Sequence, residues 1–525
     1  MACTVENPES GPIVETKAGS LEGLRADEGA GISVFRGVPF AKPPLGELRW
    51  RPPAPVEPWD GVKSATEFSP ACWQPRNADD SPYARGELVR SEDCLTLNVW
   101  SPVKKGGRLP VMVWFHGGGH TSGVGSAKIF DGTAMARKGV LMVTANYRLG
   151  PLGFMAHPAL TAESEHASSG NYGLLDHVAT LKWVRDNIAA FGGDPSNVTI
   201  FGQSAGSWSV CLLQASPLAR GLFHKAIGHS GGCFGAPRPH LAQKGGKATE
   251  TSGHDGGLAL AAKLGIEGEG PEAASALRAA SPEDVIATGV RTGAVVDGWV
   301  LPKLADEIFA AGEQNDVQLI VGSMSDEGST LFASYPETPH EEFVAGLRRL
   351  HGTDADKFLA AYKAEIDEST RTASQAIAAD RLFTWQMRAW ARATQGKNDV
   401  YRYFFSHAPP VFRLYIPDRP KLDFPDRGAG AYHSGDLAFA FGNVGLVGTE
   451  WNDREREIAN EMSGYWANFA KTGDPNGEGL PRWPRYQRES ETALEFGCKE
   501  TKPVIRVRQE KLDLFDRSYG AEPGS

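Results

Sequence analysis

The sequence predicts an α/β protein built on one large, mostly parallel sheet with helices on both faces. Three observations predict this fold class. Short, continuous apolar runs recur along most of the chain, as is typical of strands buried on both faces of a parallel sheet. Segments with apolar residues at three- and four-residue spacing alternate with these runs, which indicates helices between the strands. Glycine and proline number 61 and 35 in 525 residues, which favours long structured loops.

The N-terminal region is expected to form antiparallel strands at Ile13–Thr16, Leu21–Arg25 and Ile32–Val38, around Gly-rich turns. A Pro-rich stretch, AKPPLGELRWRPPAP, follows, and its prolines predict irregular surface structure. The buried strands are then expected, in order, at Val111–Phe115, Val140–Ala145, Val198–Phe201, Leu319–Val321 and Val400–Phe405. The clearest helical patterns are Tyr172–Phe191 and Glu455–Phe469.

Two helix-rich segments interrupt this alternation, at about 233–290 and 340–395. Length alone would allow about three domains. No linker composition separates these segments from the rest of the chain. We therefore expect residues 1–525 to form a single catalytic domain, with both segments as helical insertions that build a substrate gorge over the active site.

Composition excludes several classes of protein. Hydrophobic residues make up 41% and charged residues 22%, which is ordinary for a globular protein and excludes a disordered chain. Lysine and arginine total 54 against 64 acidic residues, a net charge of −10, which argues against nucleic acid or an anionic membrane as a partner. No apolar run approaches the length of a membrane span. Oligomeric state is left open.

The chain has six cysteines, including Cys3 near the N-terminus, and no C-x-x-C pair, so a zinc knuckle is not expected. The first fifteen residues contain no basic and no apolar region of the kind that forms a secretory signal. A native N-terminus would therefore indicate a cytoplasmic protein. A trimmed signal would instead indicate a secreted or periplasmic one.

The strongest motif is Gly202-Gln203-Ser204-Ala205-Gly206, directly after the strand expected at Val198–Phe201. A G-x-S-x-G sequence between a strand and a helix is typical of a nucleophile elbow, a sharp turn that presents the serine hydroxyl. Larger side chains at the flanking glycines would clash in such a turn. We therefore expect Ser204 to be a nucleophile, whereas an ordinary serine in a Gly-rich turn is the alternative.

A second glycine motif, His116-Gly117-Gly118-Gly119, follows the strand at Val111–Phe115. An oxyanion hole needs backbone N–H groups that converge on one point without side chains in the way. Consecutive glycines can adopt the required backbone angles. Together, the two motifs make a chance match to either one improbable.

A serine nucleophile needs a base, and the base needs an orienting acid, which follow the serine in this order along the chain in such a fold. The acid is expected after the strand at Leu319–Val321, where either Asp326 or Glu327 could serve. For the base, spacing favours His433 over His407 only weakly. The pattern of residues alone leaves both choices open.

With these motifs, the chain resembles the type-B carboxylesterases of the α/β-hydrolase superfamily, the group that includes the cholinesterases. The resemblance runs along nearly the whole chain. It includes the two glycine motifs above and also FRGVPFAKPPLGELRWRPPAPVEPWDGV near the N-terminus, SEDCLTLNVW at 91–100, NYRLGPLGF at 146–154, VVDGWVLP at 295–302 and FAKTGDPNG at 469–477.

The resemblance implies an α/β-hydrolase fold and assigns the remaining roles. It makes Glu327 the acid and His433 the base of a triad with Ser204. It also implies an oxyanion hole formed by the N–H groups of Gly118, Gly119 and Ala205. No metal or organic cofactor is implied.

The resemblance further implies a disulfide between Cys72 and Cys94, which would require an oxidising compartment. The second disulfide of the family is not expected, because Ile266 stands where its cysteine would be.

Departures from the family pattern bear on the substrate. The loop between the expected disulfide cysteines carries no Trp after its midpoint, and 289–294 is free of aromatic residues, so choline esters are not the expected substrates and the acyl side is roomy. His120 stands where Phe or Tyr is usual and is interpreted as a tolerated change, and Gln203 in place of the commoner Glu is interpreted as neutral.

The sequence thus predicts a serine carboxylic-ester hydrolase that acts on small-molecule esters of a broad or xenobiotic type. One alternative is the same machinery specialised for an amide, a carbamate or a polyester-like substrate. A more distant alternative is a non-catalytic binding protein with the same fold.

Overall fold

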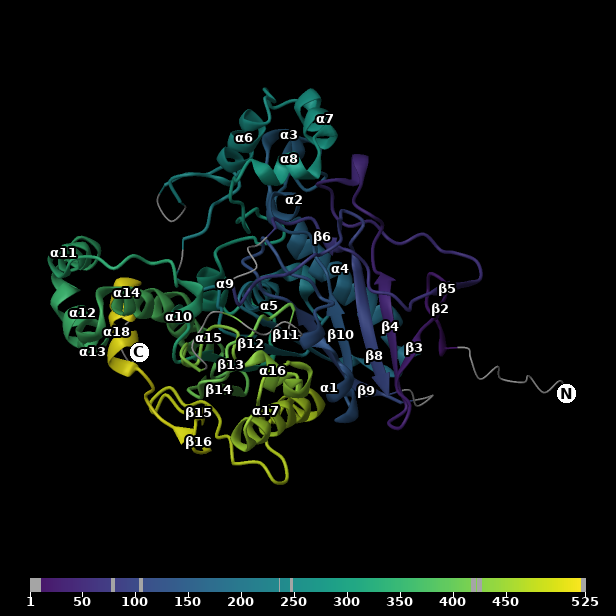
Figure 1. Ribbon diagram of the computed structural model, residues 1–525. Coiled ribbons are helices and arrows are strands. Elements are labelled where there is room, and N and C mark those ends of the chain that lie inside the picture. The colour runs from purple at the N-terminus through teal and green to yellow at the C-terminus, as the bar shows by residue number, and fades with distance from the viewer. Residues whose placement is uncertain are drawn as a thin grey trace.

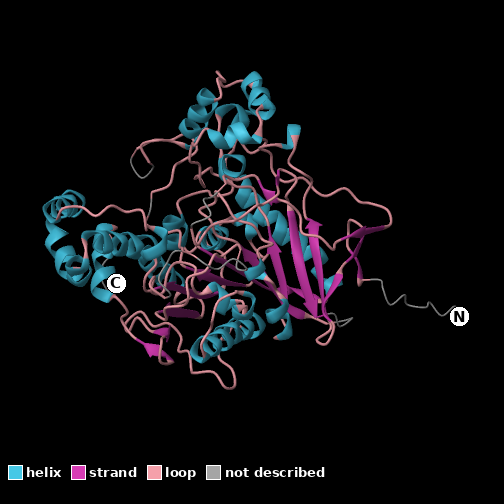
Figure 2. Ribbon diagram, viewed as in Figure 1, coloured by secondary structure: helices cyan, strands magenta, loops and turns pink. Residues whose placement is uncertain are grey.

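The computed structural model describes residues 11–76, 81–102, 107–235, 237–245, 249–416, 422 and 427–520, so that Cys3 lies outside the described residues. Within these ranges, eleven strands form one mixed sheet flanked by helices (Figures 1 and 2). The α/β architecture predicted from the sequence is confirmed. A separate small sheet is formed by β1 (Ile13–Glu15), β2 (Ser20–Glu22) and β5 (Val62–Ser64). Its first two strands come from the first two strand regions predicted near the N-terminus.

The large sheet is parallel through its middle and antiparallel at both ends. Parallel pairing runs without a break from β15 to β10, while β16 and the group of β8, β4 and β3 pair antiparallel. In spatial order the strands are β16 (Thr501–Val504), β15 (Ala493–Phe496), β14 (Val400–Phe405), β13 (Gln318–Met324), β12 (Lys225–His229), β11 (Gly193–Gln203), β9 (Leu109–Phe115), β10 (Leu141–Ala145), β8 (Thr96–Pro102), β4 (Ile32–Pro39) and β3 (Leu24–Asp27).

The five predicted interior strands are β9, β10, β11, β13 and β14, and most of their residues are fully buried. The run predicted at Leu21–Arg25 is wrong as one strand, because it divides at Gly23 into β2 and β3. A Cβ on Gly23 would lie 2.6 Å from the carbonyl oxygen of Val34, so the chain can bend against β4 only at a glycine. Strands β8, β12, β15 and β16 were not predicted, because their apolar cores are short or interrupted by polar residues.

Helices cover both faces of the sheet. One buried cluster includes residues of α4 (Tyr172–Asn187) and α5 (Ala205–Ala215), and the other includes α1 (Thr133–Arg137), α16 (Leu437–Ala440) and α17 (Asp453–Thr472). Helix α17 begins with a capping box in which Asn452 and Glu455 satisfy each other's backbone N–H groups. The predicted helix at Tyr172–Phe191 ends as α4 at Asn187 and continues as a short 3-10 turn, Ile188–Phe191.

The remaining helices include both predicted insertions. In Figure 1, α6, α7 and α8 lie together with α3 at the top, and α11 to α14 lie beside α18 at the left. The bounds are α2 (Gly150–Phe154), α3 (Pro158–Ala162), α6 (Gly253–Lys263), α7 (Pro271–Ala279), α8 (Pro282–Ala287), α9 (Ala305–Ala311), α10 (Gly328–Leu331), α11 (His340–His351), α12 (Ala355–Ala361), α13 (Lys363–Glu368), α14 (Thr370–Ala379), α15 (Trp385–Thr394) and α18 (Gln509–Ser518). A π-helical turn, η6 (Asp380–Thr384), joins α14 to α15.

Short 3-10 turns and a two-stranded pair complete the described elements. The turns are η1 (Gly46–Leu48), η2 (Lys128–Phe130), η4 (Pro217–Ala219), η5 (Gly352–Asp354) and η7 (Val444–Leu446), and the pair is β6 (Ala71–Cys72) with β7 (Arg90–Ser91). In the described part of the chain, no helix combines the length and apolar character that a membrane crossing requires.

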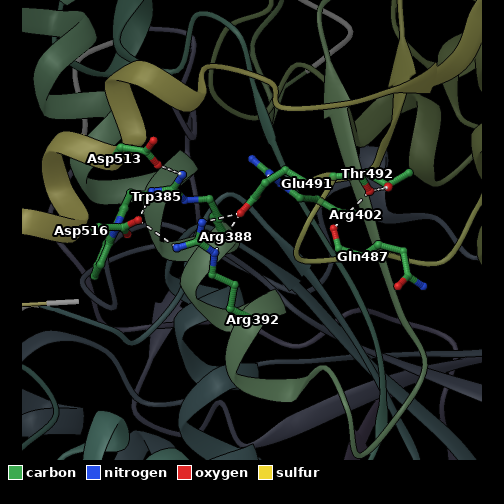
Figure 3. Close-up of polar contacts among 10 residues, drawn as sticks. Trp385, Arg388, Arg392, Arg402, Gln487, Glu491, Thr492, Asp513 and Asp516 are labelled. Atoms are coloured by element: carbon green, nitrogen blue, oxygen red, sulfur yellow. Dashed lines mark hydrogen bonds and ion pairs between the residues drawn. The ribbon is translucent and has the colours of Figure 1, made fainter. Parts of the chain in front are cut away.

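A buried network of charges fastens α18 to α15 (Figure 3). Asp516 of α18 accepts hydrogen bonds from Trp385 Nε1 and Arg392 Nη1, and its Oδ2 lies 2.7 Å from Arg388 Nη2. Glu491 pairs with Arg392 and with Arg402 of β14 on the other side. Opposite charges at such close range compensate one another where water is excluded. The network thus ties the C-terminal helix to the helix that follows η6.

Two disulfides are present in the described residues. Cys72–Cys94 was predicted from the family resemblance and is confirmed. Cys211–Cys233 was not predicted, because neither cysteine is marked by its sequence context. Their Cα atoms lie 5.8 Å apart because α5 and the segment after β12 run side by side. This second bond links the helix after Ser204 to the beginning of the first insertion.

Candidate active site

Ser204 lies at the sharp turn between β11 and α5, with φ 56° and ψ −122°, a conformation that L-residues rarely adopt. The flanking glycines explain the motif. A Cβ on Gly202 would come within 2.4 Å of the Gly206 carbonyl carbon, and one on Gly206 within 1.9 Å of the Phe115 carbonyl oxygen. The Ser204 N–H donates to the carbonyl of His229 in the next strand, which holds the turn in place.

The glycine loop after β9 lies directly against the elbow. A Cβ on Gly117 would approach Ser204 Cβ to 3.2 Å. Gly118 and Gly119 have φ angles of 111° and 65°, which favour glycine, and a Cβ on Gly118 would clash with the Ser122 carbonyl. The Gly118 carbonyl accepts from the N–H groups of Thr121 and Ser122, which closes the turn. The loop is therefore built so that its peptide N–H groups remain free of side chains.

Glu327 and His433 are brought into contact, although they are 106 residues apart in sequence. His433 Nδ1 lies 2.5 Å from Glu327 Oε2, and both side chains are buried. The other carboxylate oxygen accepts the N–H of Met324 at the end of β13. Because a carboxylate only accepts, Nδ1 carries the proton and Nε2 of the neutral ring is left as an acceptor.

The alternatives that the residue pattern left open lie elsewhere. Asp326 accepts the Ala431 N–H through Oδ2, so it braces the loop that carries His433 instead of touching its ring. His407 lies 3.2 Å from Glu455 at the start of α17. Neither residue contacts Ser204 in the hydrogen bonds of the described residues.

His433 Nε2 faces Gln203, the residue before Ser204. The Gln203 side-chain nitrogen lies 2.9 Å from Nε2, so the amide donates to the lone pair of the ring. Among the hydrogen bonds of the described residues, none joins Ser204 Oγ to His433. Catalytic hydrogen bonds often tighten only when substrate is bound. The prediction that Gln203 in place of Glu has no effect is therefore incomplete, because its amide donates to the same nitrogen that would accept the proton of Ser204.

Tyr83 and Phe383 contact His433 and were not identified from the sequence. The Tyr83 hydroxyl donates to the His433 carbonyl oxygen at 2.9 Å and lies 2.8 Å from Thr330 Oγ1. Burial raises the pKa of Tyr83, so its hydroxyl remains a donor. The Phe383 ring centre lies 4.6 Å from that of His433. Neither the loop that holds Tyr83 nor the helical turn that holds Phe383 carries a sequence signal for such a role.

A second buried histidine–aspartate pair lies behind the elbow. His229 Nδ1 lies 2.8 Å from Asp436 Oδ2, and Trp466 Nε1 donates to the other ring nitrogen. Because the His229 carbonyl accepts from Ser204 and Asp436 follows His433 by three residues, the pair connects the two loops. The sequence did not indicate this pair. The base was sought after the acid along the chain, and His229 precedes both candidate acids.

His120 is a structural link between the glycine loop and α5. Its Nε2 lies 2.9 Å from both the Ala205 carbonyl and Ser209 Oγ, and its ring stacks on Phe154. A carbonyl only accepts, so Nε2 carries the proton. Burial lowers the pKa of His120 to about 3, so the ring is neutral at neutral pH. His120 thus holds the residue whose N–H was predicted to complete the oxyanion hole.

The described residues contain no group of three or more His, Cys, Asp or Glu side chains arranged to hold a metal ion. The groups around the elbow are a serine hydroxyl, an imidazole, a carboxylate and the backbone N–H groups of the glycine loop. Such a set performs nucleophilic acyl transfer.

Comparisons with known proteins identify the family and solved structures of the same fold. The model of the carboxylesterase family matches residues 10–515. Fumonisin B1 esterase of Sphingopyxis macrogoltabida is 36% identical over 500 residues, covering 93% of this chain and 86% of that protein. Para-nitrobenzyl esterase of Bacillus subtilis (strain 168) is 35% identical, with 92% and 94% coverage. A solved structure of a PNB esterase superposes with a TM-score of 0.78 at 32% identity and covers 96% of this chain and 99% of that one.

Proposed function

The chain belongs to the carboxylesterase family and is a carboxylic ester hydrolase of the α/β-hydrolase superfamily, and from this premise we propose that Ser204, His433 and Glu327 carry out the hydrolysis. The observation that carries the proposal is the contact of His433 with Glu327 beside the strained elbow of Ser204. An imidazole that a carboxylate orients through Nδ1, with Nε2 as an acceptor, is the base that nucleophilic ester cleavage by a serine requires.

In the first half of the reaction, the Gln203 amide turns away and His433 Nε2 takes the proton from Ser204 Oγ. The oxygen attacks the ester carbonyl carbon, and the carbonyl oxygen becomes an oxyanion. The N–H groups of Gly118, Gly119 and Ala205 stabilise that charge. The protonated imidazole, held by Glu327, then gives its proton to the leaving alcohol, and an acyl-enzyme remains.

In the second half, water takes the place of the alcohol. His433 accepts a proton from the water, whose oxygen attacks the acyl carbon. Collapse of this second oxyanion returns the proton to Ser204 Oγ and releases the carboxylic acid. Bonds broken and formed balance to the addition of one water to the ester.

We propose a broad range of small-molecule esters as substrates, and not choline esters. The relatives are named for esters of unlike structure, fumonisin B1 and para-nitrobenzyl compounds, which supports a permissive site. The sequence between Cys72 and Cys94 lacks the tryptophan after its midpoint that would hold a quaternary ammonium. We also propose that residues 1–525 act as one catalytic unit, with the insertions at about 233–290 and 340–395 enclosing the gorge.

The test uses the Ser204→Ala variant with Ser196→Ala as its control. Ser196 is an exposed serine on the same strand, so its variant should keep full hydrolysis of p-nitrophenyl butyrate. Ser204→Ala should lose hydrolysis by at least about 10³-fold and should no longer be labelled covalently by an organophosphate. Full activity in Ser204→Ala would refute the assignment. A matched panel of esters, amides and carbamates would reveal the specialised alternative as a preference for a non-ester.

A further inference from the structure

The Tyr83 hydroxyl joins the segment of the proposed base to the segment of the proposed acid. It donates to the His433 carbonyl oxygen at 2.9 Å, and its oxygen lies 2.8 Å from Thr330 Oγ1. Because a carbonyl only accepts, the Tyr83 proton is used there, and Thr330 donates to the Tyr83 oxygen. Thr330 lies three residues after Glu327. The contacts therefore form a chain of hydrogen bonds from the Glu327 segment to the backbone of His433.

The His433 carbonyl depends on this hydroxyl. Among the hydrogen bonds of the described residues, no other is made to the carbonyl oxygen of His433, and the residue is buried. The next residue, Ser434, has a φ of 74°, a left-handed conformation that a serine adopts at a cost. Such a turn persists only where its surroundings support it. Loss of the Tyr83 hydroxyl would therefore leave a buried acceptor unsatisfied at a strained turn beside the imidazole.

Tyr83 belongs to the disulfide loop, by which we mean the described residues between Cys72 and Cys94. Tyr83 lies eleven residues from each cysteine, at the middle of this loop. The disulfide joins the two ends of the loop, so its middle has fewer conformations open to it than it would have in a chain with free ends. The position of the Tyr83 hydroxyl therefore depends on the closed loop.

The same loop also contacts the glycine loop. The buried side-chain amide of Gln74 donates to the Gly123 carbonyl and accepts the Gly123 N–H, both at 2.8 Å. This amide also donates to the Cys72 carbonyl at 2.9 Å. A Cβ on Gly123 would lie 2.6 Å from the Gly117 carbonyl oxygen, so Gly123 packs against the glycine motif itself. The disulfide loop thus binds the glycine loop near one end and the backbone of His433 at its middle.

Resting on the proposed Ser204 chemistry, we propose that Tyr83 is a positioning residue that fixes His433 relative to the glycine loop, and that closure of the disulfide loop keeps Tyr83 in place. The hydroxyl acts through His433, since its hydrogen bonds go to the His433 backbone and to Thr330. A general base must lie within hydrogen-bond reach of the proton that it takes. A small displacement of the imidazole therefore slows proton transfer from Ser204 without weakening substrate binding.

The first test compares Tyr83→Phe with wild type on p-nitrophenyl butyrate. The variant keeps the ring and removes only the hydroxyl, and it should lower kcat by about 10-fold at unchanged KM. The rate at which paraoxon labels Ser204 should fall by about the same factor, because labelling also requires His433 to take the serine proton. Thr330→Val, which removes the hydroxyl that donates to Tyr83, should give a smaller loss of about threefold.

Tyr465→Phe is the matched control. The Tyr465 hydroxyl also donates to a backbone carbonyl, that of Pro481, and its ring packs on Trp483 and Phe496. Tyr465→Phe should lower the thermal midpoint about as much as Tyr83→Phe and should change kcat by less than about twofold. A loss of kcat in Tyr83→Phe no larger than in this control would overturn the proposal, and so would a rise in KM at unchanged kcat. Hydrolysis by Ser204→Ala would instead show that the underlying chemistry is wrong.

The part played by the loop is tested by replacing Cys72 and Cys94 together with serine, in assays well below the thermal midpoint of the variant. Opening the loop should lower kcat by about three- to tenfold while Tyr83 is present. In the Tyr83→Phe background, the same two replacements should lower kcat by less than about twofold, because the contact that they loosen is already absent. Losses that simply multiply would overturn the link between the disulfide and Tyr83.

Discussion

Replacing Asp516 by Asn tests whether the charge network in Figure 3 holds the C-terminal helix on the catalytic unit. The change keeps the size of the side chain and removes its charge. Arg388 and Arg392 then remain buried with one anion fewer beside them. Because Asp516 is only 3% exposed in the folded protein, water cannot replace the lost charge. Breaking a buried pair by removing one partner costs about 3–5 kcal/mol.

The magnitude translates into a measurable thermal shift. The unfolding entropy of about 2.1 cal/mol/K per residue amounts to roughly 1.1 kcal/mol/K for the whole chain. A loss of about 3–5 kcal/mol therefore lowers the thermal midpoint by about 3–5 °C. Trp385 Nε1 then donates to a neutral amide oxygen instead of a carboxylate. Trp385 lies two residues after Phe383, whose ring packs on His433. We therefore also expect a smaller, several-fold decrease in kcat.

Asp513 provides the matched control, because it lies one turn away on the same helix and binds Arg388 through one hydrogen bond while 23% exposed. Asp513→Asn should cost about 1 kcal/mol or less, and its midpoint should shift by about 1 °C. Scanning calorimetry of both variants gives the comparison. Equal shifts in the two variants, or no shift in Asp516→Asn, would refute the reasoning that burial decides the cost.

Three other outcomes follow from the structure. Glu327→Gln should lower kcat on p-nitrophenyl butyrate by about 10³- to 10⁴-fold at unchanged KM, and a loss below tenfold would remove Glu327 from the triad. Replacing both Cys72 and Cys94 by serine frees a loop with a sequence separation of 22 and should cost about 3 kcal/mol, seen as a lower denaturation midpoint than that of the oxidised wild type. Reduction of the wild type, which also opens Cys211–Cys233, should lower the midpoint at least as far. Burial lowers the pKa of His116 to about 4 and of His120 to about 3, so the unfolded chain binds protons first as the pH falls below about 6.5. Stability conferred by the neutral rings is present at pH 7 and should fall by roughly 2–3 kcal/mol for each ring by pH 4.5; urea titrations of His120→Gln should show about half of the joint decline, and a decline equal to that of wild type would contradict it.

Much of the fold could be predicted because its signals are local. The apolar runs of β9, β10, β11, β13 and β14 are strands buried on both faces, and burial requires continuous apolar sequence. The strands that escaped prediction have short or interrupted apolar sequence: β15 and β16 lie at one edge of the sheet, whereas β12 lies in its middle but carries Lys225 and His229. The split of the second N-terminal strand at Gly23 depends on contact with β4, which local sequence does not encode.

By itself the sequence determined the elbow at Ser204 and the glycine loop, since each needs glycines at fixed positions along a few residues of chain. The residue pattern did not distinguish Asp326 from Glu327 as the acid, or clearly favour His433 over His407 as the base. Only the resemblance to a family assigned these roles. The tertiary structure alone decided which side chains meet: Glu327 with His433, Gln203 with His433 Nε2, and Cys211 with Cys233. The physical reason is range, because backbone geometry is set by neighbours in sequence, whereas hydrogen bonds and charge pairs form between segments that only the folded sheet brings together.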